Sequence, residues 1–231
     1  MSRSLKLIFA SLTFIVISFA AVLPAQADSI VLFNTGVTAP GTPAPGGSTD
    51  THYTITASPT GASAAIVASS IPGVYIPNDS NSQWISISSN TFGPVGNYTY
   101  RTTFNLTGLN PASAVITGRW ATDNTGLDIL INGISTGNTN TTQFGSYTSF
   151  SINSGFTAGV NTLDFIVNNG SNSDNPTGLR VEFLQATAPP QTSAVPEPTT
   201  MLLLGTGLAG VAVKARKRRK ASKRGVSEEH R

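Results

Sequence analysis

The chain is 231 residues long, contains no cysteine and carries a formal charge of +3 at pH 7. Without cysteine, no disulfide supports the fold and no thiol chemistry is available. The charge is uneven, because the stretch from Asp28 to Ala194 holds three arginines against eight carboxylates, a formal charge of −5. An acidic stretch binds polyanions poorly, so we expect no nucleic-acid partner. Its length suits one domain with a core of its own.

The first residues have the three regions of a secretory signal peptide. Arg3 and Lys6 precede an apolar run from Leu7 to Leu23. Ala25-Gln26-Ala27 then places small residues where a signal peptidase requires them. We therefore expect residues 1–27 to be a signal peptide that is cleaved before Asp28. The alternative is an uncleaved membrane anchor.

Residues 28–187 predict an all-β domain. Thr, Val, Ile, Tyr and Phe alternate with polar residues in short runs that Gly, Pro, Asn and Asp separate. Short antiparallel strands with one buried face each make a β-sandwich, and we expect one of the jelly-roll kind. The expected strands are Ser29–Phe33, His52–Thr56, Trp84–Ser88, Asn97–Leu106, Ser113–Thr122, Gly126–Ile131, Gln143–Ile152, Thr162–Asn168 and Leu179–Gln185.

The strand phase also predicts the core and two turns. Alternate apolar residues from Tyr98 to Leu106 share one face, as do Leu127, Ile129 and Ile131. Asn132-Gly133 and Asn169-Gly170 are dipeptides that tolerate the positive φ of tight turns. The residues that we expect in the core are Phe104, Ile129, Phe165, Val181 and Phe183.

The C-terminal residues follow a tripartite order behind a proline-containing linker at 188–194. Pro196-Glu197-Pro198 is extended, because proline fixes φ and removes a backbone donor. The apolar run from Thr199 to Val213 has no charge and predicts a helix of marginal length for spanning a membrane. A basic cluster then stops transfer and stays on the cytoplasmic side, followed by a tail at 225–231. That cluster contains Lys214, Arg216, Lys217, Arg218, Arg219 and Lys220. A nucleic-acid patch or a solvated tail is the other interpretation of such a cluster.

This order over residues 195–224 resembles the PEP-CTERM sorting signal. The resemblance implies an exported protein that is held in the inner membrane and recognised by an exosortase-type transpeptidase. The final location would be the cell surface or the extracellular space. Removal of the tail near Pro196–Pro198 is the corresponding expectation.

A second resemblance lies within the predicted sandwich. Ile131-Asn132-Gly133, the segment Phe144–Phe150 and Gly159-Val160-Asn161-Thr162-Leu163 look like the galactose-binding-like β-sandwiches that accompany many glycoside hydrolases. The stretch Thr103–Glu182 also looks like exported PEP-CTERM proteins with this fold. The resemblance implies the fold and a carbohydrate ligand. The chain has no room for the catalytic barrel of those hydrolases.

Three residues are the candidate ligand contacts. Trp84 is out of phase with Ile85 and Ile87, which makes it the better candidate for an exposed aromatic. Packing at an edge or rim of the sandwich is the favoured role, and stacking on a sugar is the role that we expect if the domain binds glycans. Asp123 and Asn124 are the polar candidates at a turn. With Asp128 they could ligate structural calcium, but turn chemistry alone also explains them, and we expect no cofactor.

Other residues are assigned structural roles. Trp120 shares the phase of Ile116 and is expected in the core rather than under a sugar. Arg119 and Arg180 are expected in buried ion pairs with Asp164 or Glu182, the alternative being contact with a ligand hydroxyl.

The predicted domain gives little support for catalysis. His52 is its single histidine, and no His-Glu-x-x-His pattern is present. The sequence therefore favours a structural or interaction protein of the cell surface that associates with exopolysaccharide. A carbohydrate-binding module is the alternative, and a secreted glycoside- or ester-acting enzyme is a distant third.

Overall fold

A computed structural model describes residues 27–191 and 203–216. Residues 27–191 belong to one compact unit, and the helix at 203–216 belongs to a second unit. The first unit has its own hydrophobic core, and its first strand pairs with its last. A fragment of residues 28–191 therefore retains the whole sandwich and is the natural unit for experiments.

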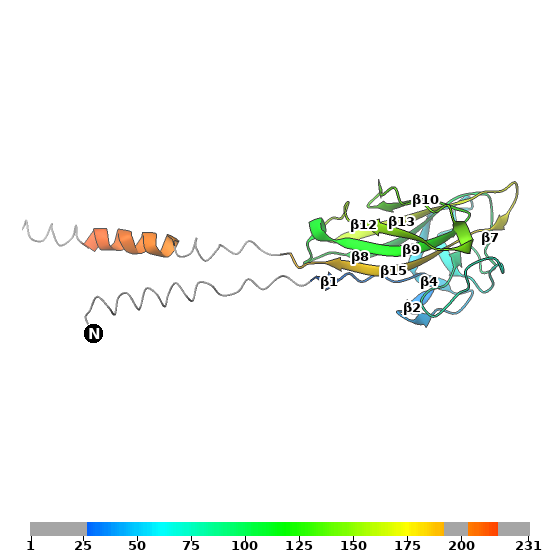
Figure 1. The fold of residues 1–231 in the computed structure, drawn as a ribbon, viewed down its shortest axis with the longest axis horizontal. Coiled ribbons are helices and arrows are strands. Elements are labelled where there is room, and N and C mark those ends of the chain that lie inside the picture. The colour runs from blue at the N-terminus through cyan, green and yellow to red at the C-terminus, as the bar shows by residue number, and fades with distance from the viewer. Residues whose placement is uncertain (1–26, 192–202, 217–231) are drawn as a thin grey trace, which may run out of the picture. The chain divides into compact units, whose positions relative to one another are not determined.

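The compact unit is the antiparallel β-sandwich that the sequence predicts (Figure 1). One 11-stranded sheet curls over on itself in the order β11-β10-β13-β8-β4-β5-β6-β15-β9-β12, with β1 beside β15. The long strands β4, β8, β13 and β10 make the first layer, and β15, β9 and β12 make the second. These elements are β1 (Asp28–Ser29), β4 (Thr49–Ala57), β5 (Ala64–Val67), β6 (Ile85–Ser86), β8 (Gly96–Asn105), β9 (Val115–Asp123), β10 (Thr125–Ile131), β11 (Ile134–Ser135), β12 (Thr148–Ile152), β13 (Val160–Asn169) and β15 (Gly178–Ala188).

Short elements complete the sandwich. Two separate ribbons pair β2 with β3 and β7 with β14, and two single 3-10 turns precede β9 and β12. Every expected strand overlaps an observed one, although the expected strand at Gln143–Ile152 begins with a 3-10 turn. These elements are β2 (Val37–Ala39), β3 (Thr42–Pro43), β7 (Phe92–Gly93), η1 (Pro111–Ser113), η2 (Gln143–Gly145) and β14 (Asn175–Pro176).

The core lies between the two layers. Phe165 of β13 meets Trp120 of β9 and Phe150 of β12, with ring centroids 5.8 and 6.0 Å apart. The predicted core positions Phe104, Ile129, Phe165 and Val181 are buried, and Phe183 is half-buried against them. Trp120 is buried in this core, as expected.

One predicted face is interrupted at β10. Ile129 and Ile131 are buried as predicted, but Leu127 is 40% exposed. The pairing of β10 with β13 shifts register between Gly126 and Asp128. An extra residue in a ladder bulges and breaks the alternation, so Leu127 leaves the face that it was expected to share.

The two predicted turns have different outcomes. Asn132 and Gly133 have φ values of 52° and 80° and connect the paired residues Ile131 and Ile134, so the tight hairpin is confirmed. The turn at Asn169-Gly170 is wrong, because Asn169 belongs to β13. Its buried amide instead donates to the carbonyl oxygens of Gly93 and Pro94 at 2.9 and 3.1 Å.

The end of the domain extends beyond the predicted boundary. Ala188 is buried in β15, and the Asn110 amide donates to the Pro189 carbonyl at 2.8 Å. The Gln191 amide donates to the Gly108 carbonyl at 2.8 Å. Residues 188–191, which the sequence assigns to the linker, are therefore held against the sandwich.

The second unit contributes a helix at 203–216, which begins inside the predicted apolar run and extends past its end to include Lys214 and Arg216. None of the helices that the structure describes is long and apolar enough to cross a membrane. The signal-peptide residues Ala25 and Gln26, the triplet Pro196-Glu197-Pro198 and the basic residues Lys217–Lys220 lie outside the described residues. Ala27 and Asp28 are described, and both are exposed.

Candidate functional site

Two of the predicted ligand contacts, Trp84 and Asp123, lie on the outer face of the second layer, away from the core. Arg119 and Asp123 of β9 and Arg180 and Glu182 of β15 alternate with residues that face the core. Two segments cover this face, residues 71–83 and the region around η2. They enclose a second apolar cluster of Ala68, Tyr75, Trp84 and Ala121, against which Ile71, Ile76, Phe144 and Tyr147 pack.

Trp84 is fully buried in this second cluster, so the prediction of an exposed sugar platform is wrong. Its indole nitrogen donates to the Ile76 carbonyl at 2.9 Å, and its ring lies 4.5 Å from that of Tyr75. The strand phase does turn Trp84 away from Ile85, as expected. Residues 71–83, however, cover the face toward which it turns.

Asp123 also lies beneath this cover, with a 3% exposed side chain. The Tyr75 hydroxyl donates to Asp123 Oδ2, and Asp123 Oδ1 has no hydrogen-bond partner in the part of the chain that the structure describes. Burial raises the pKa of Asp123 to about 6 despite that hydrogen bond. Asp123 is therefore a buried carboxyl group whose charged form is destabilised by desolvation, and it is not a surface contact for a ligand.

Asn124 acts as a clip between turns. Its side-chain Oδ1 accepts from the Gly170 backbone amide at 2.7 Å, and its backbone amide donates to the Asn168 carbonyl at 2.8 Å. Asp128 accepts from the Ile129 and Gly137 amides at 2.8 and 3.1 Å. These are the turn roles that the sequence offered as the alternative to calcium ligation.

Asp123 and Asp128 do not belong to the same layer of the sandwich. Asp128 pairs with Ile166 in the first layer, whereas Asp123 pairs with Gly178 in the second. Among residues 27–191 and 203–216, no group of three or more His, Cys, Asp or Glu side chains could hold a metal ion.

Arg180 is the centre of a buried polar network. Its guanidinium lies 3.0 Å from Asp79 and 3.6 Å from Glu182, and its Nε donates to the Ser82 hydroxyl at 2.6 Å. It also donates to the Ile76 carbonyl at 3.3 Å. Because Arg180 is fully buried, these contacts tie residues 76–82 to β15.

Glu182 joins the network to the surface. Its Oε1 accepts from Ser82 and Tyr147 at 2.7 and 2.8 Å, and its Oε2 accepts from Arg119 Nε at 2.7 Å. Burial alone would raise the pKa of Glu182, but these hydrogen bonds and the charge of Arg119 outweigh burial and lower it. The expected pairing of Arg119 and Arg180 with Glu182 is confirmed. Asp164 pairs instead with Arg101, at 2.6 Å.

Part of the network reaches solvent. The Arg119 guanidinium lies 4.4 Å above the ring of Tyr147, and the Arg119 side chain is 40% exposed. The Asp79 side chain is 48% exposed. Sequence reasoning missed Tyr147, Ser82 and Asp79. Charged residues at strand positions opposite the core, such as Arg119 and Glu182, were the available signal for a polar site here.

The comparisons with known proteins decide the role of the C-terminal residues. Residues 194–219 match the PEP-CTERM protein-sorting motif. The match contains the predicted Pro-Glu-Pro triplet, the apolar run and most of the basic cluster. This motif marks proteins that are exported across the inner membrane and sorted to the cell surface or the extracellular space, and the chain carries that signal.

Among the solved structures that are similar to this chain is that of CBM35 from Paenibacillus barcinonensis. The identity is 18%, the match covers 58% of this chain and 92% of that chain, and the TM-score is 0.31. A likeness of this size carries no argument about ligands. Comparison with curated proteins finds no match.

Proposed function

We propose that this protein is a surface or matrix protein whose sandwich associates, without catalysis, with uncharged exopolysaccharide. The motif at residues 194–219 directs export and sorting. The sandwich supplies the contact with polysaccharide through many weak hydrogen bonds. An exosortase-type transpeptidase is the expected processing partner.

The observation that carries this proposal is the neutralisation of every cation in the domain. Arg101 lies 2.6 Å from Asp164, Arg119 lies 2.5 Å from Glu182 and Arg180 lies 3.0 Å from Asp79. No lysine occurs between Asp28 and Ala194, and the rest of the surface is rich in Ser, Thr and Asn. Such a surface offers hydroxyl and amide groups but no free positive charge for an anionic polymer.

The outer face of the first layer gives these groups an open, regular arrangement. Thr103 pairs with Thr162, and the Asn168 amide donates to Asn97 Oδ1 at 2.8 Å. Exposed threonines continue along β4 at Thr54 and at Thr56. Neighbouring strands lie about 4.8 Å apart, so the hydroxyl and amide groups of this face recur at a regular spacing. An extended polysaccharide chain can therefore form hydrogen bonds with several of them in succession.

Co-sedimentation tests the proposal. The 28–191 fragment is mixed with insoluble exopolysaccharide from the producing cells, at low salt and at 0.5 M NaCl. At the higher salt concentration the Debye length is only about 4 Å, so attraction between exposed charges is screened. We expect retention that salt does not reverse, because uncharged hydrogen bonds carry it. Alginate, a polyanion, is the comparison and should retain less protein. Absence of retention at either salt concentration, or release by salt, contradicts the proposal.

A discrete sugar site is the second candidate, favoured by the half-exposed Arg119 above Tyr147. Arg119→Gln should then weaken binding of soluble oligosaccharides. Arg101→Gln is a matched control, since Arg101 is also strand-borne, has a side chain 38% exposed and pairs with a buried carboxylate in the other layer. Equal binding by the two variants would remove this candidate.

A further inference from the structure

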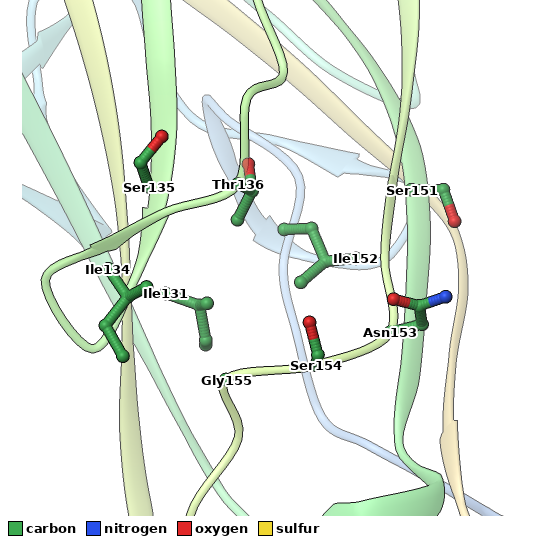
Figure 2. A pocket seen from close by; sticks show the side chains of 9 residues that line it. All are labelled: Ile131, Ile134, Ser135, Thr136, Ser151, Ile152, Asn153, Ser154 and Gly155. Carbon is green, nitrogen blue, oxygen red and sulfur yellow. The ribbon is translucent and has the colours of Figure 1, made fainter.

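A cavity of about 330 Å³ lies where the curled sheet fails to close (Figure 2). The strands β11 and β12 are the two ends of the sheet order. One wall comes from the β10–β11 hairpin and the other from the chain that follows β12. We call it the seam pocket; its lining is Ile131, Ile134, Ser135, Thr136, Ser151, Ile152, Asn153, Ser154 and Gly155.

The two walls of the seam pocket are joined by the half-buried Asn132 and the buried Asn161. The Asn132 amide donates to the Gly155 carbonyl at 2.9 Å and to Asn161 Oδ1 at 2.7 Å. Asn161 is fully buried, and its own amide donates to the Thr157 and Gly159 carbonyls at 2.8 and 2.9 Å. These contacts fix the two walls relative to each other, so the pocket exists before any ligand enters.

Gly155 sets how closely the walls approach. Its φ is +85°, and a Cβ there would lie 2.5 Å from Cγ2 of Ile131. Only glycine allows both the backbone conformation and this contact. The backbone at Gly155 therefore packs directly against the Ile131 side chain, and no side chain of residue 155 occupies the pocket.

The lining combines an apolar floor with an uncharged polar rim. Ile131 and Ile152 are buried at 2% and 3% exposure, whereas Ile134 is 61% exposed. In Figure 2, the Ser154 hydroxyl points toward the space between Ile131 and Ile152. The side chains of Asn153 and Ser154 are exposed and make no hydrogen bond to any residue that the structure describes, so both are free to bind a ligand.

This lining selects a ligand class. A charged ligand would lose its hydration without meeting an opposite charge, because no lining residue is charged. A wholly apolar ligand would leave the free Asn153 and Ser154 groups unpaired. A neutral pyranose has an apolar ring face for the exposed Ile134 and hydroxyl groups for the rim, and the pocket lies in the size range of small-molecule sites.

We propose that the seam pocket binds one neutral sugar residue, at a chain end or branch of the polysaccharide. The inference rests on the proposed function and adds a discrete subsite to it. This subsite lies in the gap between β11 and β12, away from the Arg119–Tyr147 surface.

Two-dimensional amide NMR of the ¹⁵N-labelled 28–191 fragment tests the subsite. The probes are glucose, galactose, mannose and N-acetylglucosamine, with glucuronate as the charged counterpart of glucose. We expect shifts confined to residues 131–136 and 151–155, with a Kd of about 1 mM for at least one neutral sugar. Glucuronate should bind about tenfold more weakly than glucose, because its carboxylate has no partner in the pocket.

Ser154→Leu fills the pocket without removing a protein contact, and it should weaken binding about tenfold or more. Ser171→Leu is the matched control, an exposed serine in the loop after β13, and should bind like wild type. Unchanged melting temperatures of both variants show that folding is intact.

The outcomes separate the two proposals. Shifts outside the pocket, or wild-type binding by Ser154→Leu, overturn the subsite. Retention on polysaccharide without any pocket shift at about 50 mM sugar overturns the subsite and leaves polysaccharide association standing. Loss of both retention and shifts overturns both.

Discussion

Asp123→Asn should change the pH dependence of stability, because it removes a carboxyl group whose pKa is about 6 in the fold. The ordinary value is 3.8, so the folded protein holds the proton more tightly than the unfolded chain does. Between pH 4 and 6, the native state therefore binds more protons, and the free energy of unfolding falls as pH rises. Below this window, both states are protonated and the carboxyl group has no effect on stability.

The magnitude follows from the size of the pKa difference. About two pKa units at 1.36 kcal/mol each give roughly 3 kcal/mol of destabilisation at neutral pH. The asparagine has no charge to desolvate, so this destabilisation disappears in the variant. The asparagine amide adds a donor where Asp123 Oδ1 had no partner among the described residues, but that effect does not depend on pH.

Urea unfolding of the 28–191 fragment, followed by tryptophan fluorescence between pH 4 and 7.5, measures the effect. The stability of Asp123→Asn relative to wild type should rise by roughly 3 kcal/mol between pH 4 and 7. Asp174→Asn changes an exposed carboxylate and should follow wild type throughout. A constant difference between Asp123→Asn and wild type across this range would refute the reasoning.

Three further predictions address the core, the buried network and sorting. Phe165→Ala should destabilise the fragment by about 3–5 kcal/mol in urea, and Trp84→Ala by a similar amount, since both side chains are buried; a change under about 1 kcal/mol would contradict either placement. Glu182→Gln should lower stability at pH 7 by about 3 kcal/mol and less in acid, because the lowered pKa makes its contribution fade as pH falls; a loss that is equal at pH 3 and 7 argues against it. Intact-mass measurement of protein from the native surface should give a chain that starts at Asp28 and ends near Pro196–Pro198, and a full-length C-terminus would mean a permanent anchor.

The long strands could be predicted because their pattern is local. Tyr98 and Tyr100 of β8 alternate with outward polar residues, and both are buried, as the phase requires. The Asn132-Gly133 hairpin was predictable for the same reason, since positive φ depends on the residues themselves. Asn169-Gly170 failed because the Asn169 amide finds acceptors in a distant segment. The bulge at Leu127 arises from the register of pairing between β10 and β13, and this register cannot be predicted from the local sequence.

The candidate site could be predicted only in part, because its character depends on what covers the sheet. The phase of Trp84 was correct, yet exposure depends on residues 71–83, and their position is fixed by contacts such as Arg180 with Asp79 and Ser82. The sequence left Asp164 and Glu182 open as partners of Arg119, and the register of β9 against β15 places Glu182 beside it. Polar residues opposite a core therefore indicate a polar layer without telling whether loops enclose it.

The enclosed network bears on where a ligand can bind. Ser82 donates to Glu182 and accepts from Arg180, and Arg180 lies 3.6 Å from Glu182, so a ligand would have to replace existing contacts there. Displacing a buried ion pair leaves a charge unpaired and is strongly unfavourable. Binding is easier where polar groups are free and the walls are already fixed. The seam pocket meets both conditions, with Ser154 free at its rim and Asn161 buried behind it.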